Sequence, residues 1–167
     1  IVVIPNGVDL ERFNFPPIKR QAKILYVGSL TKNKNVETLI KGFAKFEKTN
    51  PGYCLTIVGE GVEFNNLKKL AKDLAVEYKV NYLGSLSPCE VAKQMLSAKI
   101  LVLPSINEGF GVVLIEAMAA NLPCLGSNSG AIPDVIPEIT ETLFEPYDSD
   151  SLAKKKKKII NNQELYK

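Results

Sequence analysis

Short apolar runs alternate with helical patterns along almost all of the 167 residues, and this alternation constrains the fold more than any other feature. The short runs are bounded by turn residues, while the longer segments between them repeat apolar residues every three or four positions. Strands that alternate with helices predict an α/β fold built on a doubly wound, Rossmann-like parallel sheet of about six strands. The expected strands are residues 23–27, 53–58, 79–83, 100–103, 122–126 and 142–145, and the expected helices are residues 36–48, 63–75, 87–98, 112–120 and 148–161.

Glycine or proline stands at the end of most of the expected strands. Ligands of doubly wound sheets bind beyond the carboxyl ends of the strands, at the point where the strand order reverses. The first five strand ends carry Gly28, Gly59, Gly84, Pro104 and Gly126. Glycine at these positions fits both plain chain reversal and the close approach of a ligand to the backbone, so this pattern alone leaves both readings open.

The strongest functional signal is the polar, glycine-containing turn between the fourth expected strand and the helix that follows it. That helix is expected to begin near residues 109–111, and a helix start presents free N–H groups and a positive dipole that attract phosphate or a sugar oxygen. Glu108 lies at the mouth of the turn, and Glu116 lies eight residues further on. Eight helical residues rise ~12 Å, which suits polar groups at the two ends of one extended ligand. Two acids that act on one glycosidic bond lie roughly 5–9.5 Å apart, so a glycoside hydrolase is disfavoured.

These residues carry a family resemblance. Glu108 followed by Gly109-Phe110-Gly111, and Glu116 within Glu116-Ala117-Met118-Ala119, resemble the group 1 family (family four) of retaining glycosyltransferases of GT-B fold. The resemblance implies that the chain is a carboxyl-terminal, donor-binding domain, one half of a GT-B fold. It implies that Glu108 contacts hydroxyls of the donor sugar and that Glu116 holds the ribose hydroxyls. It also assigns the sugar and diphosphate to the backbone of Gly109, Phe110, Gly111, Val112 and Val113.

The turn after the first expected strand supplies a second part of the site. In the family an Arg commonly follows the glycine that corresponds to Gly28, and a Lys comes five residues after that Arg. Lys34 matches the lysine, while Ser29 occupies the position of the arginine. A diphosphate leaving group needs cations and backbone amides to take up its charge, and Lys34 at the start of a helix is suited to this. We therefore expect Lys34 and Glu108 to be the catalytic residues, with the Ser29 hydroxyl as a weaker phosphate ligand.

Two further turns resemble the family loops that line the nucleotide. They are Gly59-Glu60-Gly61 after the second strand and Gly84-Ser85-Leu86 after the third. The resemblance implies that the base is recognised largely by the backbone near Leu86. Because backbone contacts leave no side-chain signature, the sequence does not distinguish a UDP-sugar from a GDP-sugar donor.

The first residues of the chain resemble a domain junction. Residues 4–9, Ile-Pro-Asn-Gly-Val-Asp, are similar to the family's passage into its second domain. We therefore expect residues 1–17, with a strand-like run at residues 1–4 and the stiff pair Pro16-Pro17, to be a linker segment from a missing amino-terminal domain. Residues 18–167 are then the nucleotide-sugar donor-binding domain. In the family the acceptor lies on the amino-terminal domain, so this fragment alone is expected to be inactive in transfer.

Composition excludes several other classes of protein. The chain has no His, which removes His-based triads and His metal ligands, and its three cysteines lack the spacing of a metal site. No metal and no cofactor are therefore expected. The net charge of +3 comes without an aromatic-studded basic patch, so no nucleic-acid partner is expected. The lysine run at residues 154–158 is expected to be a solvated helix face, with a membrane-surface or partner contact as the alternative.

The resemblance thus predicts the donor-binding domain of an enzyme that transfers a hexosyl group from a nucleoside diphosphate sugar, with retention of configuration. We expect a cytoplasmic protein, and the peripheral contact of the full-length enzyme with the cytoplasmic face of a membrane stays open. A nicotinamide-dependent oxidoreductase is disfavoured, because Phe64 occupies the third glycine position of G-x-G-x-x-G in the second turn. A non-catalytic nucleotide-sugar-binding or scaffold domain is the alternative that remains, since Ser29 weakens the expected phosphate site.

Overall fold

The computed structural model describes residues 7–136 and 142–161. Within these residues six strands form one sheet in the order β3-β2-β1-β4-β5-β6, and every neighbouring pair is parallel. The predicted doubly wound, Rossmann-like α/β fold is therefore confirmed. The strands are β1 (Lys23–Val27), β2 (Cys54–Val58), β3 (Val80–Tyr82), β4 (Ile100–Leu103), β5 (Cys124–Ser127) and β6 (Leu143–Phe144).

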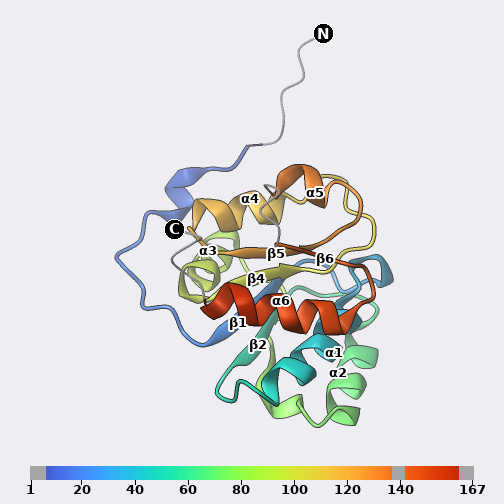
Figure 1. Ribbon diagram of the computed structural model, residues 1–167. Helices are drawn as coiled ribbons and strands as arrows, with labels where there is room; N and C mark the ends of the chain where they lie inside the picture. Colours follow the sequence, from blue (N-terminus) through green and yellow to red (C-terminus); the bar gives the residue numbers. More distant parts are fainter. Residues whose placement is uncertain (1–6, 137–141, 162–167) are drawn as a thin grey trace.

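Helices cover both faces of this sheet. Figure 1 shows α4 and α5 on one side and α1, α2 and α6 on the other. The right-handed connection from β3 to β4 puts α3 on the same face as α4, because the chain crosses the sheet in the opposite direction after β3. The helices are α1 (Val36–Glu47), α2 (Phe64–Asp73), α3 (Pro88–Ser97), α4 (Val112–Ala119), α5 (Ile132–Val135) and α6 (Ser149–Asn161), with 3-10 turns η1 (Leu10–Phe13), η2 (Lys32–Lys34) and η3 (Glu77–Lys79).

The two central strands form the middle of the core because they have helices on both faces. All four residues of β4 are buried, and the first four of β1 are buried as well. A strand covered on both faces needs a mostly apolar sequence, as in residues 24–27 and 100–103, while the buried Lys23 donates to Gln94 and Ser97. A local signal also fits the start of α3, since Ser87 and Glu90, three residues apart in the sequence, form a reciprocal cap there.

The structure corrects two expectations about secondary structure. The helix α5 was not predicted, because a single turn that contains Pro133 is too short to show a helical period. The third strand is shorter than residues 79–83, since the 3-10 turn η3 takes up Lys79. Neither difference moves the edge of the sheet at which a ligand is expected.

The lysine run on α6 is not the solvated face that its charge indicates. Lys154, Lys157 and Lys158 are exposed, but Lys155 is half-buried and donates to the carbonyl oxygen of Leu143. Lys156 is fully buried against α1, with its Nζ 5.8 Å and 5.2 Å from the centres of the Phe43 and Phe46 rings. Burial lowers the pKa of Lys156 to about 7.

The described residues before β1 pack on the α3–α4 face of the sheet. The turn η1 packs against α3, and Lys93 of α3 lies 5.3 Å above the ring of Phe15. The guanidinium of Arg20 donates to backbone carbonyls at the carboxyl ends of both α3 and α4, with partners at Met95, Ala98, Ala120 and Asn121. Such charged donors satisfy the last carbonyls of a helix. The predicted strand-like run at residues 1–4 lies outside the described residues.

No helix in the described part of the chain has both the length and the apolar content that a membrane span requires.

Candidate functional site

The candidate site lies where the strand order reverses, between β1 and β4. These two strands are neighbours in the sheet, yet their following helices leave toward opposite faces. The loops after β1 and β4 therefore diverge at the carboxyl edge of the sheet, and open α/β sheets bind ligands in the crevice at such a point. The β1 loop carries Lys34, and the β4 loop carries Glu108.

Lys34 and Glu108 are brought together across this crevice. The Lys34 Nζ lies 2.7 Å from the Glu108 Oε2, and the two side chains are 25% and 14% exposed. The loops that carry them are joined by their backbones, because the N–H of Ile106 donates to the carbonyl oxygen of Asn33 at 2.8 Å. The sequence paired these two residues only through family resemblance, 74 positions apart, and the fold places them in contact.

The loop that carries Glu108 is fixed from the β5 side. The N–H of Ala131 donates to the Glu108 carbonyl oxygen at 3.0 Å, and the hydroxyl of Ser129 donates to the Ile106 carbonyl oxygen. Gly130 lies between them with a φ of +60°, and a Cβ there would lie 2.7 Å from both the N and the O of Glu108. Only glycine fits this close approach without displacing the Glu108 backbone. Sequence reasoning missed Ser129 and Gly130 as supports of the site.

The start of α4 faces the crevice with its amides uncapped. Gly111 is the residue before the first helical turn, with a φ of +75°, and no described side chain caps that turn. Gly109 is exposed, and a Cβ there would meet nothing within 4 Å. Gly111 itself is buried, so the backbone at this helix start is exposed at Gly109 and Val112, where an anion or sugar oxygen could reach it. Of the other backbone positions assigned to the sugar and diphosphate, Phe110 and Val113 are half-buried and Val112 is exposed.

Glu116 lies in a different environment, at the far end of α4. Its side chain is 23% exposed, and burial raises its pKa, while the Arg12 guanidinium opposes that rise. The Arg12 Nη1 lies 4.0 Å from the Glu116 Oε1. Arg12 belongs to η1, so this turn contributes a cation beside Glu116. No local pattern around Arg12 indicates this contact, because it depends on how η1 packs.

Most of the predicted nucleotide-lining residues surround one cavity of about 310 Å³, while Gly61 and Gly84 of the same turns line a neighbouring one. Gly28 and Ser29 come from the β1 end, Gly59 from the β2 end and Leu86 from the β3 end. Gly28 and Gly59 pack backbone to backbone, since a Cβ on Gly59 would lie 2.0 Å from the Gly28 carbonyl oxygen. The predicted residues thus form two groups at the same edge of the sheet: the Lys34–Glu108 pair, and the residues that line this cavity. Glu116 belongs to neither group, and its described contact is with Arg12.

Among residues 7–136 and 142–161, no group of three or more Cys, Asp or Glu side chains is arranged to hold a metal ion. Glu60 also lines the 310 Å³ cavity, and its Oε1 accepts from the Ser85 N–H at 3.3 Å. The charges within this part of the site are therefore single side chains and helix dipoles.

Comparison with known proteins assigns the family. Residues 8–167 match the family of glycosyl transferases group 1, and the chain belongs to that family. It is 34% identical over 152 residues to an N-acetyl-alpha-D-glucosaminyl L-malate synthase of Bacillus anthracis, covering 90% of this chain and 39% of that protein. It is also 34% identical over 166 residues to a glycogen synthase of Mycobacterium tuberculosis, covering 97% of this chain and 40% of that protein. The chain thus spans about two fifths of the length of these relatives.

Solved structures agree on the fold. An Anabaena protein solved in complex with UDP aligns with a TM-score of 0.86 at 21% identity, over 97% of this chain and 48% of that one. The C-terminal domain of a group 1 family glycosyl transferase from Francisella tularensis aligns with a TM-score of 0.82 at 24% identity, over 96% of this chain and 91% of that one. The described unit therefore has the Rossmann-like fold of a GT-B domain.

Proposed function

We propose that this chain is the carboxyl-terminal, donor-binding domain of a retaining glycosyltransferase that transfers a hexosyl group from a nucleoside diphosphate sugar. The observation that carries the proposal is the Lys34–Glu108 pair, 2.7 Å apart at the switch point and beside the uncapped start of α4. A sugar diphosphate needs a cation and free helix amides for its phosphates, and a carboxylate that accepts hydrogen bonds from its sugar hydroxyls. Lys34, the start of α4 and Glu108 supply these groups at one place. The family and the relatives named above support the transferase class.

The diphosphate would bind between Lys34 and the first amides of α4, with the Ser29 hydroxyl as a further donor. Glu108 would then accept hydrogen bonds from hydroxyls of the sugar, and Lys34 would turn from the carboxylate toward a phosphate oxygen. As the bond between the anomeric carbon and the phosphate oxygen breaks, its electron pair stays on the diphosphate. Lys34 and the helix dipole stabilise that charge without a metal ion.

The nucleoside would extend away from the sugar. The base would lie in the 310 Å³ cavity near Leu86, held by backbone groups, and Glu116 would accept from the ribose hydroxyls. The Anabaena protein was solved in complex with UDP, which favours UDP among the donors. A GDP-sugar remains the other donor consistent with backbone recognition of the base.

The acceptor would bind to an amino-terminal domain that precedes this chain in the full protein. Residues 1–17 would be the linker from that domain, and residues 18–167 the donor-binding domain. A transferase gains much of its rate by holding two reactants in one orientation, so the donor half alone would bind donor and transfer nothing. We place the full enzyme in the cytoplasm, with or without a peripheral contact at the membrane face.

A non-catalytic nucleotide-sugar-binding or scaffold domain is the second candidate. Ser29, exposed at the position where the family commonly has an arginine, favours it, because one of two expected phosphate cations is absent from that turn. The two candidates agree on binding and differ only in transfer.

Transfer from a radiolabelled UDP-sugar to candidate acceptors separates them. The chain should form no product alone, and should form product when the amino-terminal half of a full-length relative is fused before residue 1. Rapid transfer by the isolated chain would contradict the assignment to half an enzyme. A fusion that binds UDP but transfers to none of the acceptors would favour the scaffold.

A further inference from the structure

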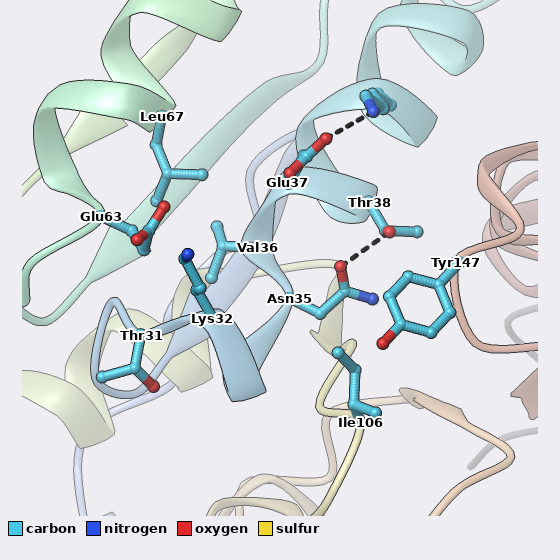
Figure 2. A pocket seen from close by; sticks show the side chains of 11 residues that line it. Thr31, Lys32, Asn35, Val36, Glu37, Thr38, Glu63, Leu67, Ile106 and Tyr147 are labelled. Carbon is cyan, nitrogen blue, oxygen red and sulfur yellow. Dashed lines mark hydrogen bonds and ion pairs between the residues drawn. The ribbon is translucent and has the colours of Figure 1, made fainter.

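A second cavity, of about 480 Å³, lies between the starts of α1 and α2 and the loop before α6. Figure 2 shows it with Lys32 and Glu63 at one side and Asn35, Ile106 and Tyr147 at the other. Its walls include η2 and the β4 loop, but neither Lys34 nor Glu108 lines it. The cavity is therefore next to the proposed donor site and separate from it, and its volume is typical of a small-molecule site, ~300–1,000 Å³.

Asn35 brings an unsatisfied donor to this cavity. The residue is 7% exposed and has a φ of +49°, and its Oδ1 accepts from the Thr38 hydroxyl at 2.9 Å. Its Nδ2 is buried without a hydrogen-bond partner. In Figure 2 that nitrogen is on the side that faces Tyr147. A buried donor without a partner costs about 1–3 kcal/mol, and a ligand oxygen that reaches it recovers that cost.

Tyr147 covers the amide from the loop before α6. Its side chain is 66% exposed and its φ is +64°, a costly conformation for a bulky residue. The Oδ1 of the next residue, Asp148, accepts from the N–H groups of Asp150 and Ser151 at 2.9 Å each, which anchors the loop on α6. Because the ring is largely exposed, it can turn aside without disturbing the core, and this opens the Asn35 amide to the cavity.

The charges around the cavity favour a neutral ligand. Two lysines, Lys32 and Lys41, and two glutamates, Glu37 and Glu63, line it, so its formal charge is balanced. Lys41 is already paired with Glu37 at 2.5 Å. The glutamates would repel an anion, and the lysines would repel a cation. Hydroxyl groups of a neutral ligand can donate to the carboxylates and accept from the Asn35 amide.

We propose that this cavity binds a neutral sugar ring, stacked on Tyr147 and accepting a hydrogen bond from the Asn35 Nδ2. An exposed tyrosine ring offers a flat apolar face, and the surrounding amide and carboxylates match a ring of hydroxyls. This site goes beyond the proposed donor site, because it needs neither nucleotide nor diphosphate. A sugar from an acceptor chain and a free glycan share this chemistry, as does the sugar of the donor itself.

Titration of the isotope-labelled chain, followed by NMR, tests the proposal. The probes are the methyl α-glycosides of glucose, galactose, mannose and N-acetylglucosamine, and a linear gluco-oligosaccharide. At least one should shift the amide signals of Asn35 and Tyr147 at millimolar concentration, and glycerol should not. Tighter binding of the oligosaccharide than of the methyl glycosides would indicate a glycan chain as the source.

Two variants have matched controls. Tyr147→Gly removes the ring and suits the positive φ, and Asn35→Gly removes the amide and suits its positive φ. Each should weaken the glycoside by about fivefold or more. Tyr78→Ala, at a tyrosine that is 93% exposed elsewhere, and Asn121→Gly, at an asparagine with the same φ of +49°, should change nothing.

The proposal is overturned if no glycoside shifts these signals, if glycerol shifts them equally, or if both variants bind as the parent does. UDP added to the same samples separates this outcome from the proposed function. UDP should shift Gly28, Leu86 and Glu116 without displacing the glycoside. A UDP-sugar that competes with the glycoside where UDP does not would make the cavity the donor's own sugar site and would also overturn the proposal.

Discussion

Lys34 and Lys156 have the same side chain and lie in opposite surroundings. Lys34, at the carboxyl edge of the sheet, is 25% exposed and has the Glu108 carboxylate at 2.7 Å. Lys156, at the interface of α1 and α6, is fully buried with no hydrogen-bond partner and has the rings of Phe43 and Phe46 around its Nζ. The first lysine has a carboxylate partner at the carboxyl edge of the sheet, whereas burial of the second disfavours its charged form.

The two lysines show that the fold needs exposed polar groups at one place and close packing at another. At the switch point, loops present paired charges and open amides, and the backbone is held by glycines that allow close approach. At the α1–α6 interface, close packing dominates, since a Cβ on Gly42 would lie 2.1 Å from a methyl carbon of Leu152. Close packing at the α1–α6 interface stabilises the fold, and the residues at the switch point are those to which we assign the chemistry.

The largest expected effect concerns Lys156. Its folded-state pKa of about 7 is below the ordinary 10.5, so between these values the unfolded chain binds a proton that the folded chain has lost. Stability should therefore rise with pH across this window, by up to ~1.4 kcal/mol per pH unit, and the penalty is fully present below about pH 7. Urea unfolding at about pH 7 and about pH 9 measures the gain. Lys156→Met should lose it, and Lys157→Met, at an exposed lysine, should keep it.

Gly130→Ala should give the next largest effect, at the switch point. The new Cβ meets the Glu108 backbone at 2.7 Å and adopts a φ of +60°, so we expect a loss of about 2–3 kcal/mol in unfolding free energy. Gly52→Ala is the control, because Gly52 also has a positive φ but has no atom within 4 Å of the new Cβ. Equal losses in the two variants would mean that the Glu108 loop is not held as described.

Lys34→Met should weaken UDP binding with little effect on unfolding. A hydrogen bond to a charged group contributes about 1.5–3 kcal/mol, which corresponds to about tenfold or more in Kd. Lys32→Met, two residues away in the same turn and exposed, is the control. If the two variants bound UDP equally, the ion pair would be structural only.

Glu116→Ala should weaken UDP by about tenfold, through loss of the ribose contact. Arg12→Met should have a smaller effect in the same direction, because Arg12 is 4.0 Å away and acts only by favouring the charged carboxylate. Calorimetry at two pH values reports both. The Arg12 variant should lose UDP affinity mainly at the lower pH. If Arg12→Met bound UDP more weakly than Glu116→Ala, Arg12 and not Glu116 would be the residue that contacts the nucleotide.

The sequence predicted most of the fold because its signals are local. Apolar runs fixed β1 and β4, and Ser87 with Glu90 fixed the start of α3. The residues of the site were predicted through the Glu108–Glu116 motif and the turn after Gly28, and the contact between Lys34 and Glu108 is a finding of the structure. Their roles, and those of the nucleotide-lining residues, stay predictions.

What the sequence did not predict depends on contacts between distant segments. The burial of Lys156 was missed although its spacing from Leu152 and Ile159 puts all three on one face of α6, because the charge of the lysine run outweighed that period in the prediction. The contact of Arg12 with Glu116 and the close approach of Gly130 to Glu108 were missed as well. The partners of these residues are defined only in the packed structure, because they lie far away along the chain.

Calorimetric titration of the chain with UDP and GDP, in the presence of a chelator, tests the central claim most directly. Lysine and helix amides are proposed to neutralise the diphosphate, so at least one nucleotide should bind in chelator, and added magnesium should leave its Kd unchanged. Failure of both nucleotides to bind, or binding that appears only with magnesium or manganese, would contradict the account of the donor site.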